Sequence, residues 1–197
     1  YLMKAASDLE KFDTDLQALG EYDLQRRLTP EQVDAFAALV EKHAPLYEQL
    51  EKAAACEKYQ MKGNLAAGIS LNVPHVMHSR TVARAYSVKA LVAAYQDKGV
   101  EGLGQCATSL RLTNNLSQEP ILISHLVNLA CQAIAIETAN HTLRVANTTP
   151  PARQQLDEVL AAIDNRQASV AAMKGERALG VMTFQQMRDG SINPDDV

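Results

Sequence analysis

The chain has 197 residues, of which 47% are hydrophobic, so it is long enough to bury a core and too apolar for a disordered chain. Its formal net charge is -4 and its longest basic run is Arg26-Arg27, which gives no support to nucleic-acid binding. Only 9 Gly and 7 Pro interrupt it, too few for a many-stranded β fold. We therefore expect a single all-α domain over residues 1–197, built from antiparallel helical hairpins stacked as a bundle or a short α-α superhelix.

Charge is distributed unevenly along the chain. Residues 1–62 hold 12 acids and 8 bases, whereas residues 63–148 hold only 4 acids and 6 bases. Charged side chains are rarely buried. We therefore expect charged, solvated helices over residues 1–58, apolar core helices over residues 74–146, and a C-terminal helix or helix pair over residues 150–189.

The N-terminal segment carries clear helix signals. Apolar residues recur every three or four positions from residue 2 to residue 19, which predicts a helix that ends at Gly20. The four residues from Thr29 to Gln32 have the pattern of a capping box with proline at the first helical position, so a second helix begins there. Pro45 breaks or kinks this helix and can begin another.

The helical pattern dissolves between Tyr59 and Val73. Connections of this length are often functional, so we expect this loop to form an edge for partner binding. Pro74 then begins a helix that reaches about Lys98, and a second helix from Val100 to Leu116 completes a hairpin.

The segment from Pro120 to about Val145 is the most apolar of the chain. Its apolar residues lie on nearly every side of the predicted helix, which is typical of a central helix. Its apolar runs are interrupted well short of the ~20 residues of a membrane span, so we expect the domain itself not to span a membrane. The final helical segment has a predicted break at Asp164-Asn165.

Two histidines at the start of the 74–98 helix are candidate metal ligands. His75 and His78 lie three residues apart, share a helix face, and can bind zinc if further ligands come from elsewhere. By residue type, Glu137 and His141 on the 120–145 helix are the candidate donors. The alternative, which we favour, is that these histidines form hydrogen bonds or lie at the surface.

The 120–145 helix also carries two polar lines. Glu137, His141 and Arg144 form a stripe that predicts either an acid–base group in a pocket or, as we favour, an ion-paired helix edge. His125, Asn128 and Gln132 form the second line. Buried polar groups need hydrogen-bond partners, and the candidates by type for this line are Arg80 and Arg84.

Motifs for catalysis and for cofactor binding are missing from the sequence. The serines in helical segments lack the glycines of a nucleophile elbow, and the glycines near residue 100 lack the lysine of a phosphate-binding loop. The cysteines Cys56, Cys106 and Cys131 form no CxxC pair, and the last two are predicted to be small buried hydrophobes. We expect no catalytic residue and no cofactor.

The hairpin from Ala85 to about Glu119 resembles one tetratricopeptide unit. It has the order of apolar residues, a turn at Gly99 and a following proline, Pro120, although the proline comes late and Thr108 stands where that family prefers an apolar residue. No second copy follows at the same period. The resemblance supports stacked hairpins as an architecture.

A second resemblance extends over most of the chain. The order of five short motifs resembles that of uncharacterised helical proteins common in planctomycete-type bacteria; the motifs are Tyr1–Ala6, Leu28–Gln32, Val88–Leu91, Glu119–Ser124 and Gly175–Leu179. Those proteins usually carry an N-terminal membrane or signal segment, so the resemblance implies an extracytoplasmic, periplasmic or membrane-anchored location. The present chain begins at Tyr1 without Met, as expected of a trimmed chain or one that has lost a leader. The group has no established activity.

Two functions from different classes remain open. The first is a non-catalytic helical module that binds a protein or peptide, or supports an envelope-associated protein. The second is a small-ligand or metal-binding protein that uses His75 or His78 with Glu137 or His141.

Overall fold

The computed structural model describes residues 4–56, 59–61 and 71–191, and within these ranges it is helical with no strand. This confirms the all-α prediction. The elements in chain order are α1 (Ala6–Ala18), α2 (Pro30–Lys42), α3 (Ala44–Ala54), α4 (Pro74–Tyr95), α5 (Gly99–Thr113), the short 3-10 helix η2 (Asn114–Gln118), α6 (Leu122–Val145), α7 (Pro150–Ala161) and α8 (Asn165–Arg188).

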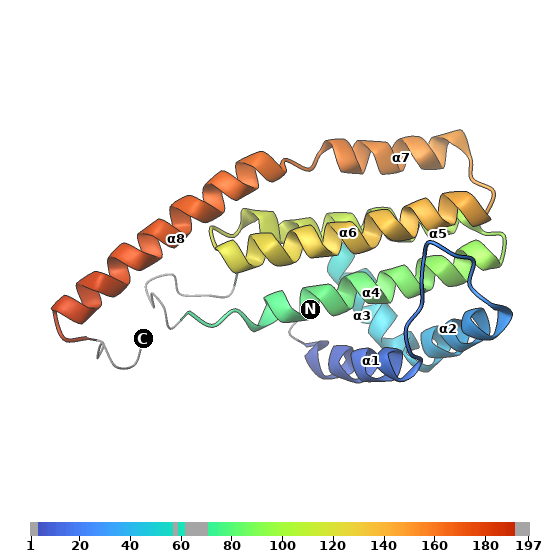
Figure 1. The fold of residues 1–197 in the computed structure, drawn as a ribbon, viewed down its shortest axis with the longest axis horizontal. Coiled ribbons are helices and arrows are strands. Elements are labelled where there is room, and N and C mark those ends of the chain that lie inside the picture. The colour runs from blue at the N-terminus through green and yellow to red at the C-terminus, as the bar shows by residue number, and fades with distance from the viewer. Residues whose placement is uncertain (1–3, 57–58, 62–70, 192–197) are drawn as a thin grey trace.

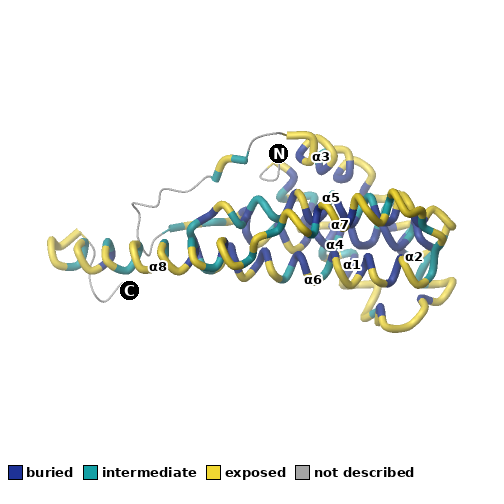
Figure 2. Tube along the Cα trace, turned by 90° about the horizontal axis from the view of Figure 1, so that it is seen from above, coloured by how far each residue is buried: buried dark blue, intermediate teal, exposed yellow. Residues whose placement is uncertain are grey.

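The helices α4, α5 and α6 form the centre of the molecule, and each packs against the other two (Figure 1). Helices α1 and α2 cover α4 from one side, and α7 covers α5 from the other. Helix α8 packs against α6 and η2 and then extends beyond the body of the molecule, where Figure 2 shows it largely exposed. The charge-poor middle of the chain therefore supplies the central helices, as its composition predicts.

Local signals place the helix ends where the sequence predicts them. Thr29 accepts a hydrogen bond from the Gln32 amide and the Gln32 side chain accepts one from the Thr29 amide, which completes the predicted capping box. Gly20 follows α1 with a φ of +82°, a value that favours glycine. Asp164 caps α8 through the Gln167 amide, so the predicted break in the C-terminal segment is confirmed.

The prediction that the 120–145 segment forms a central helix is confirmed, since α6 packs on both α4 and α5. One face of this helix is nevertheless exposed along its whole length. Its opposite face packs on α4 and α5, where Cys131 and Thr138 are fully buried. Apolar residues lie on nearly every side of α6, but neighbouring helices cover only part of its circumference.

The two predicted buried cysteines are confirmed. Cys106 and Cys131 lie in the core, and burial raises the pKa of each thiol to about 12. A thiol with so high a pKa is a poor nucleophile near neutral pH. Both cysteines therefore act as small apolar core residues.

Candidate functional sites

A buried carboxylate, Glu119, lies between η2 and α6 and collects three hydrogen bonds. Nε2 of His75 is 2.6 Å from its Oε1 atom, the Tyr59 hydroxyl also donates to Oε1, and the Ser124 hydroxyl donates to Oε2. Glu119 is only 1% exposed and His75 is 6% exposed. The cluster joins four segments: the residues that follow α3, the start of α4, the end of η2 and the first turn of α6.

The hydrogen bonds keep Glu119 ionised despite its burial. Burial alone would raise its pKa, but the donors His75, Ser124 and Tyr59 together outweigh that effect and hold the pKa of Glu119 below its usual range. Burial, together with the neighbouring Glu119 carboxylate, raises the pKa of Tyr59, so this phenol stays a proton donor. Both oxygens of the Glu119 carboxylate therefore accept hydrogen bonds from protein donors, and neither is left free to exchange a proton with a substrate.

The four candidate metal ligands of the sequence are not brought together. His75 bonds to Glu119, His78 is half-buried one turn further along α4, Glu137 is exposed, and His141 lies in a different network. Across the described ranges, no group of three or more His, Cys, Asp or Glu side chains is placed to hold a metal ion.

His141 connects α6 to the segment between α1 and α2. Its Nδ1 atom lies 2.8 Å from the Leu24 carbonyl oxygen and its Nε2 atom 3.1 Å from the Tyr95 hydroxyl. The Tyr95 hydroxyl in turn accepts a hydrogen bond from the Leu28 amide at 2.6 Å. A neutral imidazole with its proton on Nδ1 satisfies every donor and acceptor in this chain of bonds.

The other two residues of the predicted stripe on α6, Arg144 and Glu137, have different contacts. Arg144 donates to the same Leu24 carbonyl at 2.5 Å, whereas Glu137 forms no ion pair with any residue that the structure describes. The predicted ion-paired edge is therefore a backbone anchor instead. Arg144 and His141 together hold the 19–29 segment against α6.

The predicted partners of the second polar line are wrong. Gln132 pairs with Asn165 on α8, and Asn128 bonds to Asn114 in η2. Arg84 instead pairs with Asp13 on α1, at 2.7 Å. The sequence placed the polar residues on one face correctly but could not tell which neighbouring helix covers that face.

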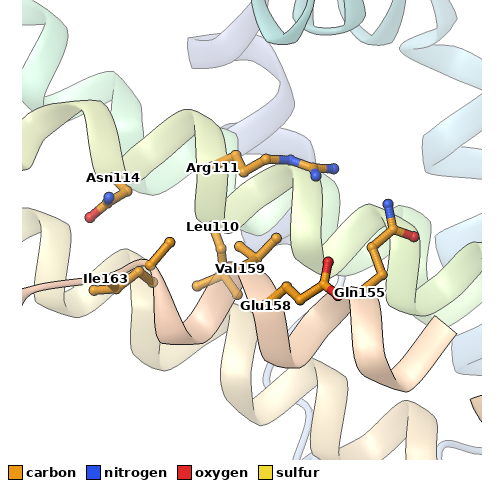
Figure 3. A pocket seen from close by; sticks show the side chains of 8 residues that line it. Leu110, Arg111, Asn114, Gln155, Glu158, Val159 and Ile163 are labelled. Atoms are coloured by element: carbon orange, nitrogen blue, oxygen red, sulfur yellow. The ribbon is translucent and has the colours of Figure 1, made fainter. Parts of the chain in front are cut away.

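A shallow groove runs between α5 and α7 (Figure 3). It has a volume of about 350 Å³, with Leu110, Val159 and Ile163 between the helices and Arg111 and Glu158 among the polar residues that line it. It lacks buried polar groups converging on one point, as a specific small-molecule site needs. We assign it no ligand.

The open face of α6 carries more exposed large apolar side chains than any other described helix. Five apolar residues and one asparagine recur along it at alternating three- and four-residue steps; we call this set the α6 seam, and it comprises Leu126, Leu129, Ala133, Ile136, Asn140 and Leu143. Its four large apolar members are 37–51% exposed. Alternating three- and four-residue spacing is the pattern with which one α-helix packs along another. Large exposed apolar patches of this kind mark interaction surfaces.

By length and composition, α6 is also the one helix of the described chain that could cross a membrane, and half of its most apolar window is buried inside the protein. A core helix of a soluble protein passes the same test. The predicted binding edge at Tyr59–Val73 falls largely outside the described residues, since only residues 59–61 and 71–73 of it are described.

Sequence reasoning missed Glu119, Tyr59 and the α6 seam. The sequence analysis names Glu119 only at the end of a hairpin and in a short motif, although it is one of just 4 acids in residues 63–148. A lone carboxylate in an apolar, charge-poor segment is the signal that could have identified it. For the seam, the signal was the heptad spacing of Leu126 to Leu143, which the apolar residues on the other sides of α6 obscured.

Comparison of the chain with protein-family models, with curated proteins and with solved structures found no match.

Proposed function

We propose that the chain is a non-catalytic helical interaction module that binds a protein partner through helix–helix packing on the α6 seam. The observation that carries this proposal is that five apolar residues are exposed at heptad spacing on α6, while the opposite side of the same helix is buried in the core. Burial of apolar side chains stabilises such a contact by about 25 cal/mol per Å² of apolar surface.

The one polar member of the seam favours a protein partner over lipid. Asn140 is exposed among the apolar side chains, and its amide needs hydrogen-bond partners wherever it is covered. Hydrocarbon offers none, whereas the polar groups of a protein can supply them. A single asparagine in a helix–helix seam also selects one register at some cost in stability.

The surroundings of α6 support a rigid binding surface. The Arg144 and His141 side chains fix its C-terminal half to the Leu24 carbonyl. At its other end, the Glu176 carboxylate on α8 accepts a hydrogen bond from the Leu122 amide at 2.8 Å, which caps the helix. A helix held at both ends loses little conformational entropy when a partner docks on it.

The saturated carboxylate cluster supports a structural role for the polar interior. Both Glu119 oxygens are occupied by protein donors, and His75 is bound to one of them. We propose that this cluster fixes the junction of α4 and α6 rather than performing chemistry.

Site-specific photo-crosslinking tests the proposed binding surface. A photoreactive phenylalanine analogue is placed at Leu126, Ile136 or Leu143 of the full chain in cells, and at Val100, which is 48% exposed on α5, as the matched control. We expect a discrete protein adduct from all three seam positions and none from Val100. Absence of adducts at the seam, or equal adducts at Val100, would contradict the proposal.

The second candidate function is metal or small-ligand binding. The observation in its favour is the buried pair of His75 and Glu119, since a carboxylate beside an imidazole is common in metal sites. The test is thermal unfolding of the purified chain with and without added zinc. A rise in the melting temperature that is lost in His75→Ala but kept in His78→Ala would favour this second function.

We also propose that the module works outside the cytoplasm, as the resemblance of its short motifs to exported helical proteins implies. Fractionation of cells that express the full-length protein tests this. Recovery of the protein with cytoplasmic markers would contradict it.

A further inference from the structure

We propose that the occupant of the α6 seam is a second copy of this chain, with the two α6 helices packed antiparallel about a two-fold axis. This inference rests on the proposed function, because it names the partner of the same surface. Two observations carry it: the large and small residues of the seam follow an order that is complementary to the same order reversed, and two charged residues beside it, Arg80 and Glu137, have no ion-pair partner among the described residues.

In an antiparallel pair of α6 helices, each residue of the α6 seam faces a residue of the second copy that complements it in size. When two copies lie antiparallel, the two central layers each pair Ala133 with Ile136 of the second copy, and the two outer layers each pair Leu126 with Leu143. A large residue facing a small one at the centre lets the helices approach closely without overlap. From Leu126 to Leu143 the seam is about 26 Å long at 1.5 Å per residue.

The two charged residues lie on the same side of the seam. Arg80 is exposed on α4, two turns before Ser87, whose hydroxyl lies 2.6 Å from that of Thr138 on α6. Cys131 lies two turns before Thr138, and Val76 of α4 packs in one cluster with Val127 and Cys131, so Arg80 lies beside α6 near the level of Cys131. Glu137 is exposed on α6, one turn before His141, whose Nε2 atom lies 3.1 Å from the Tyr95 hydroxyl of α4. Both charges therefore border the α4 side of α6.

The antiparallel register brings these charges together. If Ala133 faces Ile136 of the second copy, then Glu137 of the second copy is level with Gln132, one residue from Cys131 and hence close to Arg80. A two-fold axis keeps the α4 sides of the two copies adjacent. Each copy therefore contributes one Arg80–Glu137 pair, and the dimer contains two. Such pairs add little affinity but select the register.

Asn140 occupies the two remaining layers, where it faces Leu129 of the second copy. It lies three residues beyond Glu137, on the same side of α6, so the register also brings its amide oxygen near Arg80 of the second copy. A guanidinium has five N–H donors and can serve both the carboxylate and the amide. In the antiparallel pair, the amide oxygen of Asn140 can therefore accept a hydrogen bond from Arg80 of the second copy.

A parallel pair is the alternative arrangement of two copies. It would place the two Asn140 side chains opposite each other, where the amides could bond. Its two-fold axis, however, runs along the helices and turns the α4 side of one copy away from the α4 side of the other. Arg80 and Glu137 would then stay unpaired, so charge complementarity favours the antiparallel pair.

Met77 extends the apolar contact beyond α6. It is 67% exposed and lies one turn before Arg80 on the same face of α4. In the antiparallel register it approaches Leu143 of the second copy. A second copy therefore covers an exposed side chain that packing along α6 alone would leave in water.

The mass of the full chain in solution is the first test. Sedimentation velocity over a range of concentrations is expected to give twice the 21.5 kDa of one chain. Ile136→Glu places two carboxylates in the central layers and is expected to give a monomer with an unchanged helical circular dichroism spectrum. Val100→Glu, an equally drastic change on α5 away from the seam, is expected to remain a dimer.

Charge reversal tests the register. Arg80→Glu and Glu137→Arg each create two like-charge contacts in the dimer, and each is expected to raise its dissociation constant about tenfold. The double variant carries both reversed charges, restores both pairs, and is expected to return close to the original value. Arg166→Glu, on exposed α8 outside the proposed pairs, is the control for net charge.

Cysteine pairing tests orientation without disturbing the core. In a Cys56→Ser background, Leu129→Cys and Asn140→Cys are purified separately, mixed and oxidised. The antiparallel register brings these two positions within disulfide reach, whereas either variant alone places its two thiols about 16 Å apart along the axis. A disulfide in the mixture and none in either variant alone is expected. A disulfide in Asn140→Cys alone would indicate a parallel pair and overturn the proposal.

The outcomes separate this inference from the proposed function. A chain that stays monomeric at every concentration, or a dimer unaffected by Ile136→Glu, overturns the second-copy proposal. If the chain is monomeric and the seam positions still crosslink to another protein in cells, the interaction module stands and only its partner was wrong. Binding of the monomer to phosphatidylglycerol vesicles, lost in Ile136→Glu, would overturn both, because the seam would then serve a lipid surface.

Discussion

The His75 imidazole and the Glu119 carboxylate meet at 2.6 Å in the interior, where both side chains are almost wholly excluded from solvent. His75 lies in the first turn of α4, and Glu119 directly follows η2. The pair therefore joins the start of one central helix to the approach of another. Removal of either partner leaves the other buried without its hydrogen bond, which is more costly than losing a bond at the surface.

Glu119→Gln is expected to lower the free energy of unfolding by about 2 kcal/mol. The amide keeps the size of the side chain but replaces one acceptor oxygen with a donor that faces His75, Tyr59 or Ser124. Equilibrium unfolding in urea measures the change. The matched control is Glu48→Gln, an exposed carboxylate on α3, which is expected to change stability by less than about 0.5 kcal/mol. Equal effects of the two substitutions would show that the cluster contributes nothing specific.

Acidification is expected to remove the stability that the ionised Glu119 carboxylate contributes to the fold. The folded-state pKa of Glu119 is held below the ordinary value of 4.5, since its hydrogen bonds outweigh its burial. Its contribution to stability is therefore fully present above about pH 4.5 and is lost as the pH falls through the lower folded pKa. The difference in unfolding free energy between the wild type and Glu119→Gln isolates this effect, because the other carboxylates cancel. A difference that stays constant from neutral pH down to about pH 3 would contradict the assignment.

The sequence predicted the helices well because their ends depend on neighbouring residues. The capping box at Thr29 and the break at Asp164 each involve groups only three residues apart, so a short window contains the whole interaction. The same holds for Gly20, whose positive φ needs no distant partner. Such features are set before any tertiary contact forms.

The candidate sites depend on distant contacts and were harder to predict. The bond between His75 and Glu119 joins residues 44 apart, and His141 reaches a carbonyl 117 residues away. The sequence singled out both histidines by type but could not supply their partners. It also could not predict the open face of α6, because apolar residues on all sides of a helix indicate neither how many helices pack on it nor which side they leave uncovered.

Tyr95→Phe is expected to destabilise the protein by about 1–3 kcal/mol. Its hydroxyl accepts from the Leu28 amide and lies within reach of His141 Nε2, so its removal leaves a donor and an acceptor without their partner. Tyr86→Phe is the matched control, because the Tyr86 hydroxyl is buried without a hydrogen-bond partner in the described structure. Its removal is expected to be neutral or stabilising. Urea unfolding of the two variants side by side measures the contrast, and a larger loss in Tyr86→Phe would refute this account of the network.

Gly175→Ala is expected to weaken the docking of α8 on the start of α6. A Cβ atom at this position would overlap the Pro120 carbonyl oxygen, so the two backbones must move apart. That movement strains the bond between Glu176 and the Leu122 amide, and we expect a loss of about 1–3 kcal/mol.

Gly180→Ala, five residues further along the same helix, is expected to have the opposite effect on α8. Its Cβ meets nothing within 4 Å, so alanine gains helix propensity without a clash and is expected to stabilise α8 by up to about 1 kcal/mol. Hydrogen exchange of α8 amides measures both effects, with faster exchange expected in Gly175→Ala and slower exchange in Gly180→Ala. Because both substitutions add the same methyl group to the same helix, similar exchange in the two variants would mean that the close approach to Pro120 does not hold α8 in place.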